Sequence, residues 1–178
     1  MWRSLDDLFE YMQALVESSR LMNLLAAEEE LDRLIQEYGL DGLSNQWHVH
    51  RMMVLENMAT LYNNIGFRYQ PAILEAGKQG DLEGQHLAAR EAARCHGKAL
   101  NLHGMNSPED VLYLPSNHMP KVFIATFWGL GSSNYFLGKP DQGRKYLELC
   151  LRLRPPDPQA AALQDNARSL YEIIVRQP

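Results

Sequence analysis

The sequence contains little cysteine, no long apolar run and no excess of positive charge. Its two cysteines, Cys95 and Cys150, lack the spacing of a disulfide framework or a zinc site, so we expect reduced thiols that serve as small packing residues. No run of about 18 apolar residues is available to span a membrane. The formal net charge is -5, whereas general binding to nucleic acid or anionic lipid requires a basic surface. We therefore expect a cytoplasmic protein that neither binds nucleic acid nor inserts into a membrane.

Strand patterns are also missing, because no alternating apolar and polar run of strand length stands out. Apolar residues make up 46% of the 178 residues and recur at helical spacing, which predicts an all-α fold with a sizeable core. We expect a single domain over residues 1–178. It divides into an N-terminal helical hairpin (4–39), a long hairpin (44–102), a loop (103–119), a third hairpin (120–157) and a capping helix (158–176).

Local start and stop signals set these boundaries. Ser4 precedes two aspartates in the first turn of the first helix, and Asp157 precedes a proline at the start of the last one. Both arrangements are common helix caps. Gly39 is placed to end the second helix and Ser44 to start the next one. Pro71 is expected to bend or end that long helix, because it has no amide hydrogen and crowds the preceding turn.

Residues 124–157, IATFWGLGSSNYFLGKPDQGRKYLELCLRLRPPD, place bulky and small residues at regular intervals around a glycine turn. The pattern consists of Phe127, Leu130-Gly131, Gly138, Gly143, Leu147, Cys150 and Pro155. This segment resembles the tetratricopeptide repeat, a helix-turn-helix unit of roughly 34 residues. It departs from the family at Asn134, where tyrosine is preferred and Tyr135 stands one place later.

The resemblance implies a stack of about three antiparallel helical hairpins, closed by the C-terminal helix, that winds into a short superhelix with a concave face. An irregular helical bundle is the alternative arrangement. The implied function is that of a non-enzymatic interaction module, such as an adaptor, a scaffold or a chaperone, which holds a peptide or partner segment with apolar anchors. Two other functions remain open. One is a helical bundle that binds a small ligand or a metal, and the other is an obligate structural subunit of a homo-oligomer.

The resemblance also implies where a partner would bind. The groove-facing positions of the repeat are Trp128, Ser132 and Phe136, and the polar residues Asn63, Asn64 and Arg68 come late in the predicted third helix. If both sets line one groove, the aromatic rings would anchor apolar side chains and the polar residues would set the register by hydrogen bonds. The alternative interpretation is that the asparagines face solvent and the aromatic rings belong to the core.

Residues that could form a catalytic or metal site do not follow a known pattern. The candidates are His48 with His50, Glu83 with His86, and Cys95 with His96 and His103. The first two histidines are two residues apart on a predicted helix, which turns them roughly 200° from each other. The single Glu-x-x-His lacks the second copy that di-metal bundles need, and the third group matches no zinc spacing. We therefore predict no catalytic residues, no metal and no cofactor.

Overall fold

The computed structural model describes residues 2–18, 20–115 and 118–176. Within these residues the chain forms helices and no β-strand, which confirms the predicted all-α fold. The elements are α1 (Leu5–Glu17), α2 (Leu21–Trp47), α3 (Arg51–Arg68), α4 (Gln70–Gln79), α5 (Leu82–Asn101), the 3₁₀ helix η1 (Pro108–Tyr113), α6 (Pro120–Phe136), α7 (Pro140–Arg152) and α8 (Pro158–Arg176). None of the helices in the described ranges is both long and apolar enough to cross a membrane.

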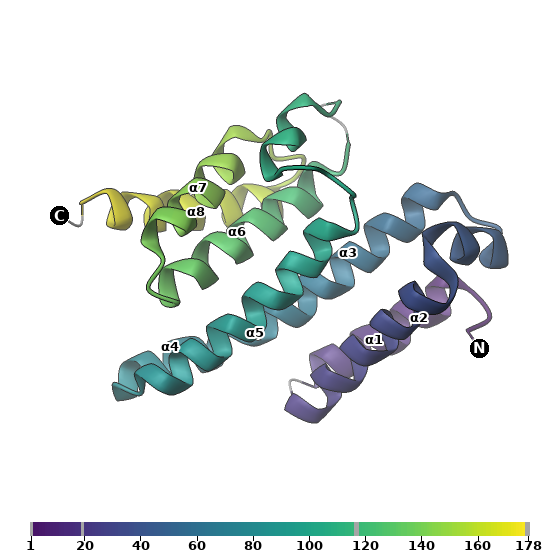
Figure 1. Ribbon diagram of the computed structural model, residues 1–178, viewed down its shortest axis with the longest axis horizontal. Coiled ribbons are helices and arrows are strands. Elements are labelled where there is room, and N and C mark those ends of the chain that lie inside the picture. The colour runs from purple at the N-terminus through teal and green to yellow at the C-terminus, as the bar shows by residue number, and fades with distance from the viewer. Residues whose placement is uncertain (1, 19, 116–117, 177–178) are drawn as a thin grey trace.

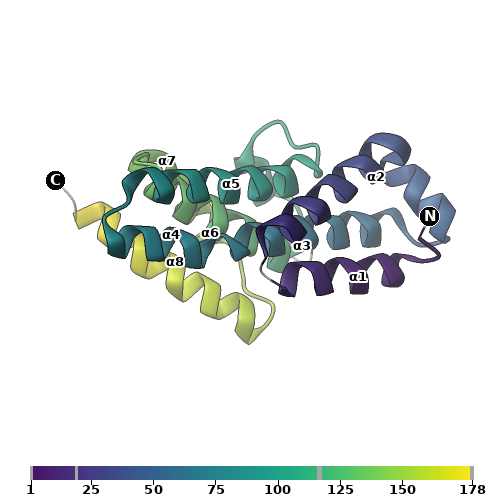
Figure 2. The same cartoon turned by 90° about the horizontal axis from the view of Figure 1, so that it is seen from below.

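The helices pack in two layers (Figures 1 and 2). In one layer α1, α3, α6 and α8 form a row in which each helix contacts the next. Figure 2 shows α2, α5 and α7 on one side of this row, and each of these packs against the helices before and after it. α4 continues the direction of α3 and pairs with α5. Helices packed in this way are compatible with a helical repeat fold.

Two predicted caps begin helices in the structure. The Ser4 hydroxyl accepts a hydrogen bond from the amide of Asp7 at 3.1 Å at the start of α1. The Asp157 carboxylate accepts one from the amide of Ala160 at 2.8 Å at the start of α8. Each side chain satisfies an amide that has no partner within its own helix, which is why the helix begins there.

The predicted boundary near Gly39 is only partly correct. Gly39 leaves the helical conformation, with φ 63° and ψ 174°, but α2 bends there and continues to Trp47. The buried side chains of Leu43 and Trp47 explain the continuation, because they extend the apolar side of the helix into the core. The next helix therefore starts at Arg51 rather than near Ser44.

The short connection between α2 and α3 corrects the prediction for two histidines. His48 has a left-handed backbone with φ 53° and caps the end of α2. The imidazole of His50 accepts a hydrogen bond from the amide of Met52 at 3.2 Å and caps the start of α3. Neither histidine lies on a helix as predicted, and both have a local role at helix ends.

The predicted loop over 103–119 contains a short helix. η1 is capped by Ser107 and Asp110, and Val111 is buried. Proline and acidic residues in its first turn favour this start. Residues 116 and 117 of the predicted loop lie outside the described residues.

α6 lies at the centre of the C-terminal half and contacts α3, α5, α7 and α8. Small residues allow its close approach to α7. A Cβ atom added to Gly143 would lie 2.9 Å from the carbonyl oxygen of Gly131. Cys150 on α7 is fully buried and its sulfur lies 3.6 Å from the carbonyl oxygen of Ile124 on α6. These residues occupy the interhelical positions that the repeat pattern assigns to small side chains.

Candidate functional site

Two of the six residues predicted to line a groove are buried between helices. Asn63 is 2% exposed and Ser132 is 1% exposed. The amide of Asn63 donates a hydrogen bond to the Thr126 hydroxyl at 2.9 Å, and the Ser132 hydroxyl accepts one from the Gln70 amide at 3.1 Å. We correct the prediction for these two residues, since they hold α6 against the α3–α4 segment and do not line an open surface.

The other four predicted residues are accessible to different degrees. Trp128 and Phe136 on α6 and Asn64 on α3 are half-buried, and Arg68 at the end of α3 is exposed. Trp128 and Phe136 both pack against the core with part of their rings. Their predicted role in partner binding stays a prediction.

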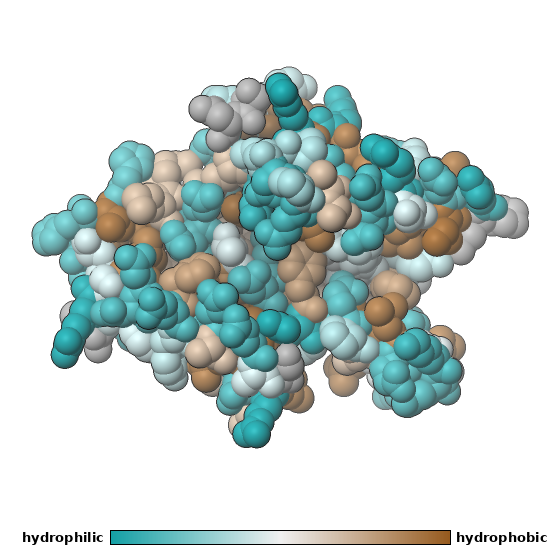
Figure 3. Space-filling view, turned by 180° about the vertical axis from the view of Figure 1, so that it is seen from behind, coloured by the Kyte–Doolittle hydropathy of each residue, from teal (hydrophilic) through white to brown (hydrophobic). Residues whose placement is uncertain are grey.

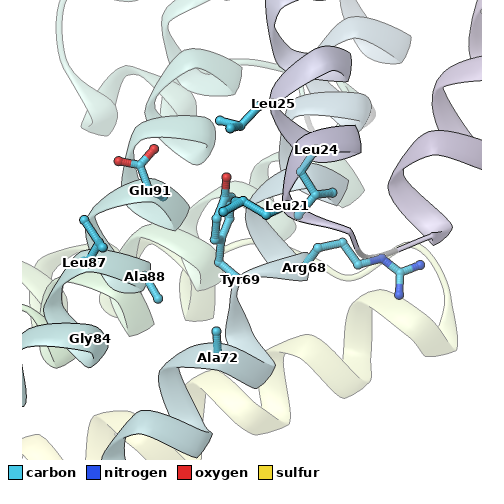
Figure 4. Close-up of a pocket in the computed structure, with 10 residues that line it drawn as sticks. All are labelled: Leu21, Leu24, Leu25, Arg68, Tyr69, Ala72, Gly84, Leu87, Ala88 and Glu91. Atoms are coloured by element: carbon cyan, nitrogen blue, oxygen red, sulfur yellow. The ribbon is translucent and has the colours of Figure 1, made fainter. Parts of the chain in front are cut away.

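A second candidate surface lies between α2, the junction of α3 with α4, and α5. Here α2, the α3–α4 junction and α5 enclose a hollow with a cavity volume of about 560 Å³ (Figure 4). It is lined by Leu21, Leu24, Leu25, Arg68, Tyr69, Ala72, Gly84, Leu87, Ala88 and Glu91. We call this hollow the α2–α5 groove. It is found where the α1–α2 pair diverges from the α4–α5 pair in Figure 1.

The α2–α5 groove has a buried floor and an exposed apolar rim. Leu24 on the floor is 3% exposed, whereas Leu21 on α2 and Leu87 on α5 are 58% and 59% exposed. Figure 3 shows the face seen from behind Figure 1, where apolar patches are separated by hydrophilic residues. Exposed apolar residues that gather around a hollow are typical of binding surfaces.

One polar group of the groove lacks a partner. Tyr69 is 6% exposed, and its hydroxyl is buried without a hydrogen-bond partner in residues 2–18, 20–115 and 118–176. In Figure 4 this hydroxyl points between Leu25 and Glu91. Burial raises the pKa of Tyr69 to about 12. The group is therefore neutral at pH 7 and can donate a hydrogen bond.

A network of charged side chains fixes α2 against α5 next to the groove. The carboxylate of Glu28 on α2 is 3% exposed and binds Arg94 at 2.7 Å and Lys98 at 2.6 Å. Lys98 also pairs with Asp32. Removing a partner from a buried carboxylate is costly, so this network holds the two walls of the groove at a fixed separation.

The two charged residues that line the groove differ in their pairing. Glu91 is bound by Arg94, whose Nε donates to its carboxylate at 3.0 Å. Arg68 forms no salt bridge with any residue that the structure describes. With respect to the described residues, the groove therefore carries one uncompensated charge, and this charge is positive.

The candidate metal and nucleophile residues form no reactive arrangement in the described part of the chain. No three His, Cys, Asp or Glu side chains are grouped there to hold a metal ion. Cys95 and Cys150 are free and buried, and burial raises the pKa of each thiol to about 12. Both are protonated at neutral pH, and a protonated thiol is a weak nucleophile.

Among the residues that line the groove, Arg68 was predicted from the sequence to contact a partner, whereas the leucines of the rim were not singled out. Leu21 and Leu25 are one helical turn apart, and Leu87 lies within an alanine-rich helix. The sequence pattern therefore does not distinguish these leucines from other residues of a helix. The available signal was that they add apolar residues beside the main core-facing set. The segment that these leucines face is determined by the divergence of two hairpins. Local sequence patterns do not encode this divergence.

Comparisons of the chain with protein-family models, with curated proteins and with solved structures find no match. The residues and geometry of the groove are therefore the basis for inferring a function.

Proposed function

We propose that this chain is a non-enzymatic interaction module with a tetratricopeptide-repeat-like stack of helices, and that it binds an apolar segment of a partner protein in the α2–α5 groove. The observation that carries the proposal is a hollow of about 560 Å³ whose rim leucines are more than half exposed. Burying a leucine side chain completely contributes about 1.5–3 kcal/mol. A partner that covers Leu21 and Leu87 therefore gains binding free energy from the burial of both side chains.

The packing order supports the repeat-like part of the proposal. The α3–α4 segment pairs with α5, α6 pairs with α7, and α8 packs on both α6 and α7. This is the order that a stack of hairpins closed by a last helix requires. The first of these units is longer than a standard repeat, because α4 extends α3 beyond Tyr69.

The proposed binding site lies away from the face of α6. Asn63 and Ser132 are already hydrogen-bonded between helices, which removes two of the polar contacts predicted there. Trp128 and Phe136 are partly covered by the core. The α2–α5 groove combines exposed leucines with a hydroxyl and a cation that have no partner among the described residues, and so offers both apolar and polar contacts.

The proposal can be tested by capturing partners from a lysate of the native host on the immobilised chain, beside Leu87→Asp and Leu82→Asp. Leu87 and Leu82 are both on α5 and are 59% and 65% exposed, but of the two only Leu87 lines the groove. A partner of the groove should be retained by the wild-type chain and by Leu82→Asp, and lost from Leu87→Asp. The captured protein is then purified and its affinity measured by calorimetry.

A second measurement locates the contact. On addition of the purified partner, hydrogen exchange should slow in residues 21–25 and 84–91. Retention of the partner by Leu87→Asp, together with loss from Trp128→Ala, would place binding on the α6 face instead. Retention by all three variants would contradict both sites.

A further inference from the structure

We infer that the α2–α5 groove holds one amphipathic helix of a partner, which brings a hydrogen-bond acceptor to the Tyr69 hydroxyl and a carboxylate to the Arg68 guanidinium. This inference rests on the proposed function, since it names the kind of segment that the groove binds. It is carried by the exposed rim, the unpartnered hydroxyl and the unpaired cation.

The rim of the groove favours a helix over a small ligand. A small ligand usually has most of its surface enclosed by its pocket. Here Leu21 and Leu87 stand on opposite walls and are 58% and 59% exposed, so a ligand that only filled the hollow would leave both in water. A helix is about 10 Å wide with its side chains. Its apolar row can fill the hollow while its flanks cover both leucines.

The Tyr69 hydroxyl requires an acceptor that the described residues do not supply. A buried hydroxyl without a partner is uncommon in folded proteins, and this one lies between Leu25 and Glu91, two residues that line the groove (Figure 4). The nearby carboxylate of Glu91 is already bound by Arg94. An occupant that places a Gln, Asn, Ser or Thr side chain in its apolar row would satisfy the hydroxyl.

Arg68 adds a charge preference at the edge of the groove. Its guanidinium is exposed and has no carboxylate partner in the described residues, although the chain as a whole carries a net charge of -5. Figure 4 shows the Arg68 side chain extending away from Tyr69. The carboxylate and the acceptor therefore occupy two different positions on the partner helix, one at its edge and one within its apolar row.

The test uses the full chain and a display library of helical peptides about four turns long. One face of each peptide carries leucine or a small polar residue, and the remaining positions are randomised. Peptides that also bind Leu87→Asp are removed before selection on the wild-type chain. Selection should enrich Asp or Glu at one edge of the leucine face and a polar acceptor at one position within it.

Two variants then test the contacts with a synthetic peptide of the enriched sequence. Arg68→Glu should bind it about tenfold more weakly, and exchanging the edge carboxylate of the peptide for lysine should restore binding to that variant. Tyr69→Phe should weaken binding about five- to tenfold, and only for peptides that carry the acceptor. Leu82→Asp should bind as the wild-type chain does.

The outcomes separate this inference from the proposed function. Peptides that depend on Leu87 but bind Arg68→Glu and Tyr69→Phe as tightly as the wild-type chain would overturn the inference alone. The same holds if no peptide is selected while a lysate protein is still captured through Leu87. If neither peptide nor protein depends on Leu87, both proposals fail. A dimer of the chain that Leu87→Asp dissociates would show that a second copy occupies the groove, and would overturn the inference.

Discussion

Nε2 of His96 lies 2.3 Å from the position that a Cβ atom on Gly129 would occupy. On the other side of the ring, a Cβ atom on Gly66 would lie 2.6 Å from the same nitrogen. The imidazole on α5 is therefore enclosed between glycines of α3 and α6, and it is fully buried. Two helical glycines, which otherwise weaken helices, here allow three helices to meet around one aromatic ring.

This contact predicts that Gly129→Ala destabilises the fold. The added methyl group would collide with His96, and overpacking of a core costs about 1–3 kcal/mol. Gly97→Ala is the matched control, because a Cβ atom there meets nothing within 4 Å. On helix propensity alone the control should be more stable than the wild-type chain, by up to about 1 kcal/mol. Urea unfolding measures both, and equal stability of the two variants would show that the ring does not fill this space.

His96 also predicts how stability changes with pH. Burial lowers the pKa of His96 to about 3, whereas the unfolded chain has a histidine pKa of about 6.5. The unfolded state therefore binds the extra proton between these values. Stability should rise with pH across this window, by up to about 1.4 kcal/mol per pH unit, and the full contribution is present above about pH 6.5.

The variant His96→Gln isolates this effect. The variant should be less stable at neutral pH, because a smaller side chain leaves part of the space between Gly66 and Gly129 empty. Between about pH 4 and 6.5 its free energy of unfolding should change less steeply than that of the wild-type chain, by about one proton. Parallel slopes for the two proteins would mean that His96 titrates normally in the fold.

Two substitutions of Cys150 should differ in their effect on stability. This cysteine is fully buried where α7 meets α6, so Cys150→Leu should overpack the contact and cost roughly 1–3 kcal/mol. Cys150→Ala keeps a small side chain and should cost clearly less. The comparison is made by thermal and urea unfolding. If the fold tolerates both changes equally, the two helices do not approach each other closely at this position.

The features that depend on local signals, namely the fold class and the starts of two helices, could be predicted from the sequence. The all-α fold and the starts of α1 and α8 follow from apolar spacing and from the caps Ser4 and Asp157, and all are confirmed. Gly39 shows the limit of such signals. A glycine permits a helix to end, but the burial of Leu43 and Trp47 beyond it decides that α2 continues.

The candidate site depended on tertiary contacts that the sequence does not reveal. Asn63 appeared to be a polar residue for a groove, yet its amide is satisfied by Thr126 on a helix far along the chain. The walls of the α2–α5 groove come from three segments whose divergence sets its width. Arg68 was predicted to contact a partner, but apolar spacing did not identify Leu21 or Leu87 as the rim of a groove.

Two tyrosines of the same segment differ in whether their hydroxyl has a hydrogen-bond partner. Tyr62 on α3 is 2% exposed and its hydroxyl donates to the Asp32 carboxylate at 2.7 Å. Tyr69, two turns later, is 6% exposed, and its hydroxyl has no partner within the described chain. A hydrogen bond to a charged group contributes about 1.5–3 kcal/mol. Tyr62→Phe should therefore lose roughly that amount of stability, measured by urea unfolding at pH 7.

Tyr69→Phe should behave differently in the free chain. Removing an unpartnered buried hydroxyl relieves its desolvation, so stability should be unchanged or higher by up to about 1 kcal/mol. The same substitution removes the donor that the groove offers to an occupant, so binding should weaken while the fold is unaffected. If Tyr69→Phe loses as much stability as Tyr62→Phe, the hydroxyl already has a partner in the folded chain. It would then not be available to a ligand, and the polar contact inferred for the groove would have to be abandoned.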